Sequence, residues 1–161
     1  MLLPKNQKPI KSRSDNFLQG DIKYSIIKLQ KKRSVIFMMT AKINFITNNL
    51  LVDMTCRETE LRNSLQNIGI LIVPSMIYLD NRRTLQIQLN ANDEVGEIVK
   101  TLINTERDTL GTVQRLCRSV YCLNAKHRAE LLEMIENGEI TTAAEGIEMA
   151  KRLREPMQMC R

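Results

Sequence analysis

Two thiols and an imidazole follow one another at equal spacing in the C-terminal half of the chain, as Cys117, Cys122 and His127. Zinc binds both kinds of group, and a structural zinc site needs four ligands in a tetrahedral arrangement. Five residues turn the side chain around an α-helix by roughly 140°, so two sulfurs on one helix would point apart. We therefore expect reduced thiols, with no bound metal and no other cofactor.

Acid–base catalysis has few groups to draw on, because His127 is the single histidine of the chain. It falls in a charged stretch on what we expect to be the exposed side of a helix, where a solvated side chain is the ordinary role. Glu130, Glu133 and Glu136 recur every three residues, as on the solvent side of a helix. The chain has no glycine-rich phosphate loop, no G-x-S-x-G and no H-E-x-x-H motif. These features predict a protein that is not an enzyme.

The formal charge of +6 is unevenly distributed along the 161 residues. Residues 1–40 hold nine basic and two acidic side chains, while the other 121 residues hold 15 basic and 16 acidic ones. We expect residues 1–40 to be a basic, flexible extension that grips phosphate groups, docks onto a partner subunit or stays solvated. An alternative is that translation begins at Met38 or Met39.

Hydrophobic residues make up 43% of the chain. They form no run of the roughly eighteen that a membrane helix needs. The N-terminal residues also lack the apolar segment of a secretory signal. The length suits one domain with a tail better than two domains. The sequence predicts a globular protein of the cytoplasm with no membrane partner.

Local patterns in the middle of the chain predict two helices followed by a β-hairpin. Residues 47–54 fit a short helix, and residues 55–67 fit a second one with apolar side chains at helical spacing. Residues 70–79 are rich in β-branched and apolar side chains, and residues 84–90 alternate strictly between apolar and polar. We expect these last two segments to pair with each other across a basic turn.

Helical patterns dominate the sequence after this hairpin. Residues 92–120 carry an apolar stripe that allows for a kink at Gly111. Asn124 can cap the next helix, which should stop at Asn137 and Gly138 because these residues favour the left-handed conformation of a helix end.

A last helix is predicted from a capping box, in which Thr142 and Glu145 stand three residues apart. It should stop before Pro156, because proline has no backbone N–H to donate. The predicted fold class is α+β and mostly helical. We expect one domain over residues 41–123, with one β-hairpin, and a C-terminal helical hairpin over residues 124–156.

A resemblance to a known family runs from about residue 45 to residue 137. The segment that carries it is LRNSLQNIGILIVPSMIYLDNRRTLQIQLNANDEVGEIVKTL, which resembles the recognition helix and wing of winged-helix regulators of the MarR type. The matching positions are Leu61, Leu65, Gly69, Asp80, Arg82, Leu89 and Asn90. The later LNAKHRAELLEMIENG is similar to the penultimate helix of that family. The resemblance implies that residues 41–123 form a winged-helix-like domain, and that the protein is a homodimeric, sequence-specific DNA-binding regulator of transcription.

A recognition helix needs polar side chains opposite its buried face. With the leucines of residues 55–67 inward, the outward side chains are Thr59, Asn63 and Gln66, flanked by Arg62. Asparagine and glutamine can pair with adenine, and arginine with guanine or a phosphate. Arg82 and Arg83 at the hairpin tip could reach the minor groove or the DNA backbone, or simply keep an edge hairpin soluble.

Two other functions fit the same sequence. A ribbon-helix-helix module would place the side chains of Thr84, Gln86 and Gln88 in the major groove of DNA, from a strand shared between two copies. A protein-binding adaptor or regulatory subunit without nucleic-acid binding would use the charged helix faces and the nine methionines, because methionine adapts to varied partner surfaces.

Overall fold

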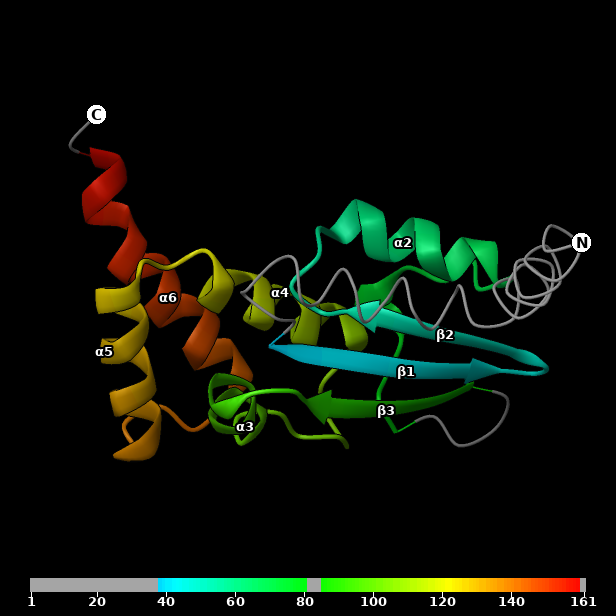
Figure 1. The fold of residues 1–161 in the computed structure, drawn as a ribbon, viewed down its shortest axis with the longest axis horizontal. Coiled ribbons are helices and arrows are strands. Elements are labelled where there is room, and N and C mark those ends of the chain that lie inside the picture. Colours follow the sequence, from blue (N-terminus) through cyan, green and yellow to red (C-terminus); the bar gives the residue numbers. More distant parts are fainter. Residues whose placement is uncertain (1–37, 81–84, 160–161) are drawn as a thin grey trace, which may run out of the picture. The chain divides into compact units, whose positions relative to one another are not determined.

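A computed structural model describes residues 38–80 and 85–159, and side chains up to residue 154. These residues lie within the second of two units into which the chain divides, Phe37–Arg161. The fold is α+β, with a three-stranded antiparallel sheet and five α-helices among the described residues (Figure 1).

The sheet is built around β1 (Met39–Phe45), which pairs on one side with β2 (Asn48–Asp53) and on the other with β3 (Leu85–Ala91). In β1 the buried Met39, Ala41 and Ile43 alternate with residues that face the other side of the sheet. This two-residue period is the requirement for a strand with one face on the core.

The segment 47–54, for which we predicted a helix, contains the whole of β2 instead. Leu50 and Val52 share one face of the strand and lie opposite Ile43 and Ala41 of β1. A tight turn joins the two strands, and Ile46 adopts a positive φ of 56° there. The prediction was wrong because a short apolar stretch fits either element, and the neighbouring strand decides between them.

The predicted hairpin between residues 70–79 and 84–90 is also absent from the described residues. The first segment holds a short 3-10 helix, η1 (Pro74–Met76), which begins at the proline. Within the described residues, the segment 70–79 pairs with another part of the chain only at an isolated β-bridge between Tyr78 and Thr109. Residues 85–91 are a strand, as predicted, but their partner is β1. Pro74 has no backbone N–H to donate to a neighbouring strand, which explains why this apolar segment does not form a continuous strand.

The helix α2 (Glu58–Asn67) agrees with the predicted 55–67 to within three residues. The predicted continuous helix over 92–120 is two helices, α3 (Glu94–Lys100) and α4 (Leu110–Tyr121). Each has its own cap, because the Asp93 carboxylate accepts from the amide of Gly96 at 2.7 Å and the Thr109 hydroxyl accepts from the amide of Thr112 at 3.2 Å. Two caps favour two helices over one kinked helix.

The last two helices confirm the local predictions at three of their four ends. α5 (Ala125–Glu136) is capped by the Asn124 side chain, which accepts from the amide of His127 at 2.8 Å, and it ends at Gly138 with a φ of +78°. α6 (Ala143–Met159) begins at the predicted capping box. It continues past Pro156, where the missing N–H costs one hydrogen bond in the last turn.

Helices cover one face of the sheet, and the hydrophobic core lies between the sheet and these helices (Figure 1). α2 packs on β2, while α4 contacts η1, α2 and α6. Close backbone approaches hold these layers: a side chain at Gly111 would meet the backbone of Ser75 and Pro74 at 2.8–3.0 Å. Among the residues described, no helix combines the length and the apolar character needed to cross a membrane.

Candidate binding site

The side chains predicted to contact DNA from α2 do face solvent. Thr59, Asn63 and Gln66 are exposed on the side opposite the buried Leu61 and Leu65. Arg62 is also exposed, but its guanidinium lies 3.5 Å from the carboxylate of Glu58 one turn earlier. The structure therefore brings the four predicted side chains to one helix surface and gives the arginine an acidic neighbour.

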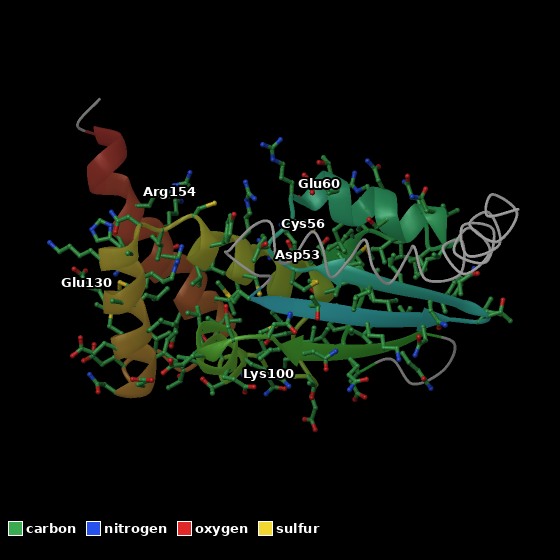
Figure 2. All side chains as sticks on the ribbon, in the orientation of Figure 1. Asp53, Cys56, Glu60, Lys100, Glu130 and Arg154 are labelled. Carbon is green, nitrogen blue, oxygen red and sulfur yellow. The ribbon has the colours of Figure 1, made fainter. Side chains whose placement is uncertain are left out.

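The start of α2 carries charges of both signs, because Arg57 and Arg118 lie there beside two carboxylates. Asp53, Cys56 and Glu60 lie close together where β2 leads into the helix (Figure 2). Burial, followed by the negative charges of Asp53 and Glu60, raises the pKa of the Cys56 thiol to about 12. The described residues as a whole contain 12 basic and 16 acidic side chains. This balance is unfavourable for contact with phosphates.

Arg82 and Arg83, the other two predicted DNA contacts, lie outside the described residues. They belong to the connection between Asp80 and Leu85. The hairpin whose tip they were to form is not present, because residues 70–79 are not a strand.

The outer edge of β3 offers unpaired backbone groups. The amide of Asn92 donates to the carbonyl of Met38 at 3.0 Å, and this bond sets the phase of the ladder between β1 and β3. In an antiparallel ladder, hydrogen-bonded and non-bonded pairs alternate. Gln86, Gln88 and Asn90 therefore direct their N–H and C=O groups to β1, while Leu85, Ile87 and Leu89 direct theirs away from the sheet. Among the described residues, no other strand pairs with this edge.

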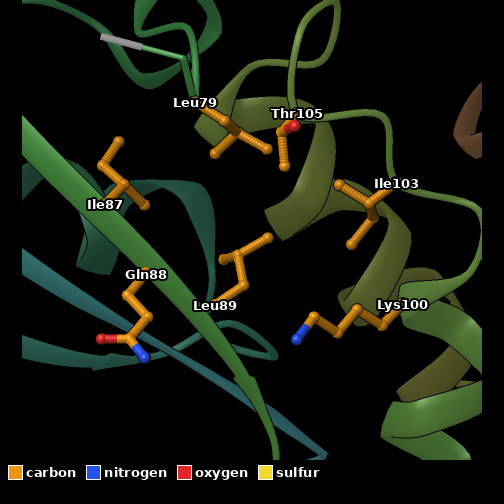
Figure 3. A pocket seen from close by; sticks show the side chains of 7 residues that line it. All are labelled: Leu79, Ile87, Gln88, Leu89, Lys100, Ile103 and Thr105. Atoms are coloured by element: carbon orange, nitrogen blue, oxygen red, sulfur yellow. The ribbon is translucent and has the colours of Figure 1, made fainter. Parts of the chain in front are cut away.

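A pocket of about 280 Å³ adjoins this edge. Figure 3 shows Ile87 and Leu89 projecting from β3 toward Leu79, Ile103 and Thr105, with Lys100 at one side and Gln88 on the strand. Ile87 and Leu89 are half-buried, although they lie on the core face of the sheet. The helices thus leave part of the apolar face at β3 uncovered.

The wall opposite β3 is the connection between α3 and α4, and hydrogen bonds hold its shape. The carboxylate of Asp108 accepts from the amide of Asn104 at 2.7 Å. The amide of Leu79 donates to the carbonyl of Asp108 at 3.2 Å, and the amide of Leu110 donates to the carbonyl of Ile77 at 2.8 Å. These bonds tie residues 77–79 to residues 104–110, so the pocket is preformed.

Lys100 is the charged side chain of this pocket. It is exposed at the last residue of α3, and its amine extends beside Leu89 (Figure 3). Within the described ranges no carboxylate forms an ion pair with it. The pocket therefore combines an aliphatic floor, a positive charge and a row of backbone groups that pair with no other described strand, and these are the elements of a peptide-binding site.

The groups considered for metal binding and catalysis lie elsewhere. Cys117 is fully buried, with its sulfur 3.9 Å from that of Met39. His127 is half-buried and not solvated as predicted, because its Nδ1 is enclosed without a hydrogen-bond partner. In the part of the chain that the structure describes, no three His, Cys, Asp or Glu residues are placed to hold a metal ion.

The sequence pattern of residues 84–90 pointed to a half-buried strand but not to the edge site. Alternation predicts that Ile87 and Leu89 share a face, and the structure confirms it. Lys100 gave no signal, because nothing local connects a lysine at a helix end to a strand that ends nine residues earlier. The fold places the chain in the α+β class. No protein-family model, curated protein or solved structure matches it.

Proposed function

We propose that this protein is a non-enzymatic protein-binding adaptor, which captures an extended segment of a partner as an added strand along β3. The observation that carries this proposal is the outward row of backbone groups at Ile87 and Leu89, directly beside a preformed apolar pocket. Backbone pairing supplies affinity in strand addition, and pockets for alternate side chains supply specificity.

The surface near this edge supports contact with proteins. Four of the six large apolar side chains that are exposed among the described residues belong to the segment 71–78, and they are Leu71, Ile72, Met76 and Tyr78. This segment leads directly into Leu79 at the pocket. Exposed apolar side chains that gather in one segment are typical of interaction surfaces.

The test selects peptides and asks whether their binding depends on the backbone of β3. A phage-displayed library of random nine-residue peptides is panned against the full chain. Ile87→Pro removes the outward N–H without removing a bond to β1, and Ile87→Ala is the matched control for loss of the side chain. We expect the proline variant to lose about two- to ten-fold more affinity than the alanine variant, since one backbone bond worth roughly 0.5–1.5 kcal/mol is lost.

Amide exchange measured by NMR locates the added strand. In the free protein the amides of Gln86, Gln88 and Asn90 should exchange slowly, and those of Ile87 and Leu89 quickly, because only the first set donates within the sheet. Binding of a selected peptide should protect the second set. Peptides that bind equally to the proline and alanine variants, or that leave Ile87 and Leu89 unprotected, would contradict the proposal.

A second copy of this chain is the other occupant that the edge could accept. Sedimentation equilibrium of the full chain and of Ile87→Pro distinguishes the two. A dimer that the proline variant turns into monomers would show that β3 pairs with β3 of another copy, and the peptide proposal would then fall.

DNA binding by a homodimeric transcription regulator remains a second candidate, favoured by the exposure of Thr59, Asn63 and Gln66 on α2. Without the predicted hairpin of residues 70–79 and 84–90, such a surface would rest on α2 and on the connection that holds Arg82 and Arg83. Replacement of both arginines by alanine should weaken binding of duplex DNA and reduce its salt dependence. Lys126→Ala on α5 is the control, and an unchanged affinity in the arginine variant would exclude those residues.

A further inference from the structure

We propose that the partner segment recognised at β3 carries an aliphatic side chain and a carboxylate two residues apart, with the carboxylate at Lys100. The inference rests on the proposed function and adds the chemistry of the ligand. It follows from where the charge of Lys100 lies relative to the apolar floor of the pocket (Figure 3).

The spacing follows from strand geometry. Side chains of an added strand alternate between the two sheet faces, and residues two apart on one face are separated by roughly 7 Å. The face that meets the pocket is the face of Ile87 and Leu89. One partner side chain can therefore enter between Ile87, Leu79 and Ile103, while the next on the same face lies near Leu89 and the amine of Lys100.

The residue between them lies on the opposite face of the sheet. There the exposed Gln88 of β3 and Lys42 of β1 are opposite each other in the register. A polar side chain suits that position, so the preferred segment reads aliphatic, polar, acidic, in one chain direction or the other. The carboxylate can come from an aspartate or glutamate side chain, or from the C-terminus of the partner.

Charge supports a carboxylate over a neutral group. Lys100 has no acidic partner within the described ranges, and the other side chains that line the pocket are uncharged. A partner carboxylate would therefore meet a cation that is not already neutralised. An exposed pair of this kind contributes modestly, about two- to five-fold in affinity, which makes it a specificity element and not the main source of binding.

The experiment uses the peptides selected on the full chain. The unsubstituted protein should enrich sequences with an aliphatic residue and an acidic residue two positions apart, whereas Lys100→Glu should enrich lysine or arginine at the second position. Replacing the acidic residue of a selected peptide by its amide should weaken binding about two- to five-fold to the parent protein and leave binding to Lys100→Met unchanged. Lys126→Met, at an exposed lysine on α5, should behave as the parent.

Synthetic peptides with free and amidated C-termini separate the two sources of the carboxylate. A loss on amidation identifies the C-terminus, and a loss on Asp→Asn or Glu→Gln identifies a side chain. If edge-dependent peptides show no acidic preference, or if Lys100→Glu enriches the same sequences as the parent, the carboxylate inference is overturned while strand addition stands. If no selected peptide depends on the β3 backbone, both are overturned.

Discussion

The side-chain amide of Gln114 donates a hydrogen bond of 2.6 Å to the backbone carbonyl of Cys56, which lies 58 residues earlier in the chain. Gln114 is buried in α4, and Cys56 belongs to the short connection from β2 into α2. One turn later, the guanidinium of Arg118 donates to the carbonyl of Thr55 at 3.1 Å. Two side chains of α4 thus hold the backbone from which α2 begins.

Removal of the first of these contacts should destabilise the protein. Gln114→Ala leaves the carbonyl of Cys56 without its donor and opens a small cavity, so we expect the free energy of unfolding to fall by about 1–3 kcal/mol. Urea denaturation followed by circular dichroism measures the change. Gln88→Ala, at an exposed site on β3, should stay within about 0.5 kcal/mol of the parent. Equal midpoints for the two variants would show that the buried bond contributes nothing.

A methyl group at Gly96 should be more harmful than one at Gly138. A Cβ at Gly96 would collide with the backbone carbonyl of Met38, which accepts the bond from Asn92, so the end of the β1–β3 ladder would have to move. Gly96→Ala should therefore cost about 1–3 kcal/mol or more. At Gly138 the space is open and only the φ of +78° is strained, at a cost of about 1 kcal/mol. Thermal denaturation ranks the two, and the opposite order would refute the close contact.

The start of α6 should lose stability in acid through Glu145. The amide of Thr141 donates to this carboxylate at 2.9 Å, and that hydrogen bond holds the pKa of Glu145 below its ordinary value of 4.5. Because the folded pKa is the lower one, the stabilisation is present above the unfolded value and is lost as the pH falls through the folded value. NMR titration of the Glu145 side chain should give a midpoint below 4.5. A midpoint at or above that value would be inconsistent with the bond.

A substitution distinguishes the contribution of Glu145 to the pH dependence of stability from the contributions of the other carboxylates. Glu145→Gln should make unfolding by urea less dependent on pH between about 5 and 2, because one group with a depressed pKa is gone. Glu148→Gln, on the same helix and also exposed, serves as the control for the loss of one charge. Both variants should show the same pH dependence if the capping bond of Glu145 is not formed in solution.

The buried thiols should resist alkylation in the native protein. Burial raises the pKa of Cys117 far above its ordinary value and that of Cys56 to about 12, so little thiolate forms at either position near pH 8. With iodoacetamide, Cys117 should react only after unfolding and Cys56 slowly, as mass spectrometry of the labelled peptides will show. Cys122, half-buried at the end of α4, is the internal comparison. Rapid native labelling of Cys117 would contradict its position in the core.

Helix ends were predictable because their determinants are local. Asn124 bonds to an amide three residues later, and Gly138 needs only its own backbone freedom to end α5. The sheet was not predictable in the same way. Met39 pairs with Ala91, which lies 52 residues later in the chain, and no short pattern specifies that partner. Residues 70–79 looked like the nearer choice, but Pro74 and the bond from Leu110 to Ile77 direct them toward α4 instead.

The candidate site depended on the same long-range arrangement. Exposure of Asn63 and Gln66 on α2 followed from helical spacing and was correct. The pocket at β3 requires residues 79, 87–89 and 100–105 to meet, and it arises from a loop whose shape is set by Asp108. Such a junction has no signature in any one stretch of the sequence.

The central position of β1 has a consequence for synthesis on the ribosome. The turn at Ile46 lets β1 and β2 associate as soon as both have left the exit tunnel, because they are neighbours in the chain. The second side of β1 must wait until Ala91 has been translated and has emerged. During that interval a nascent chain exposes a row of backbone groups and apolar side chains that the finished protein hides, and a chaperone that recognises extended apolar segments would find its target there.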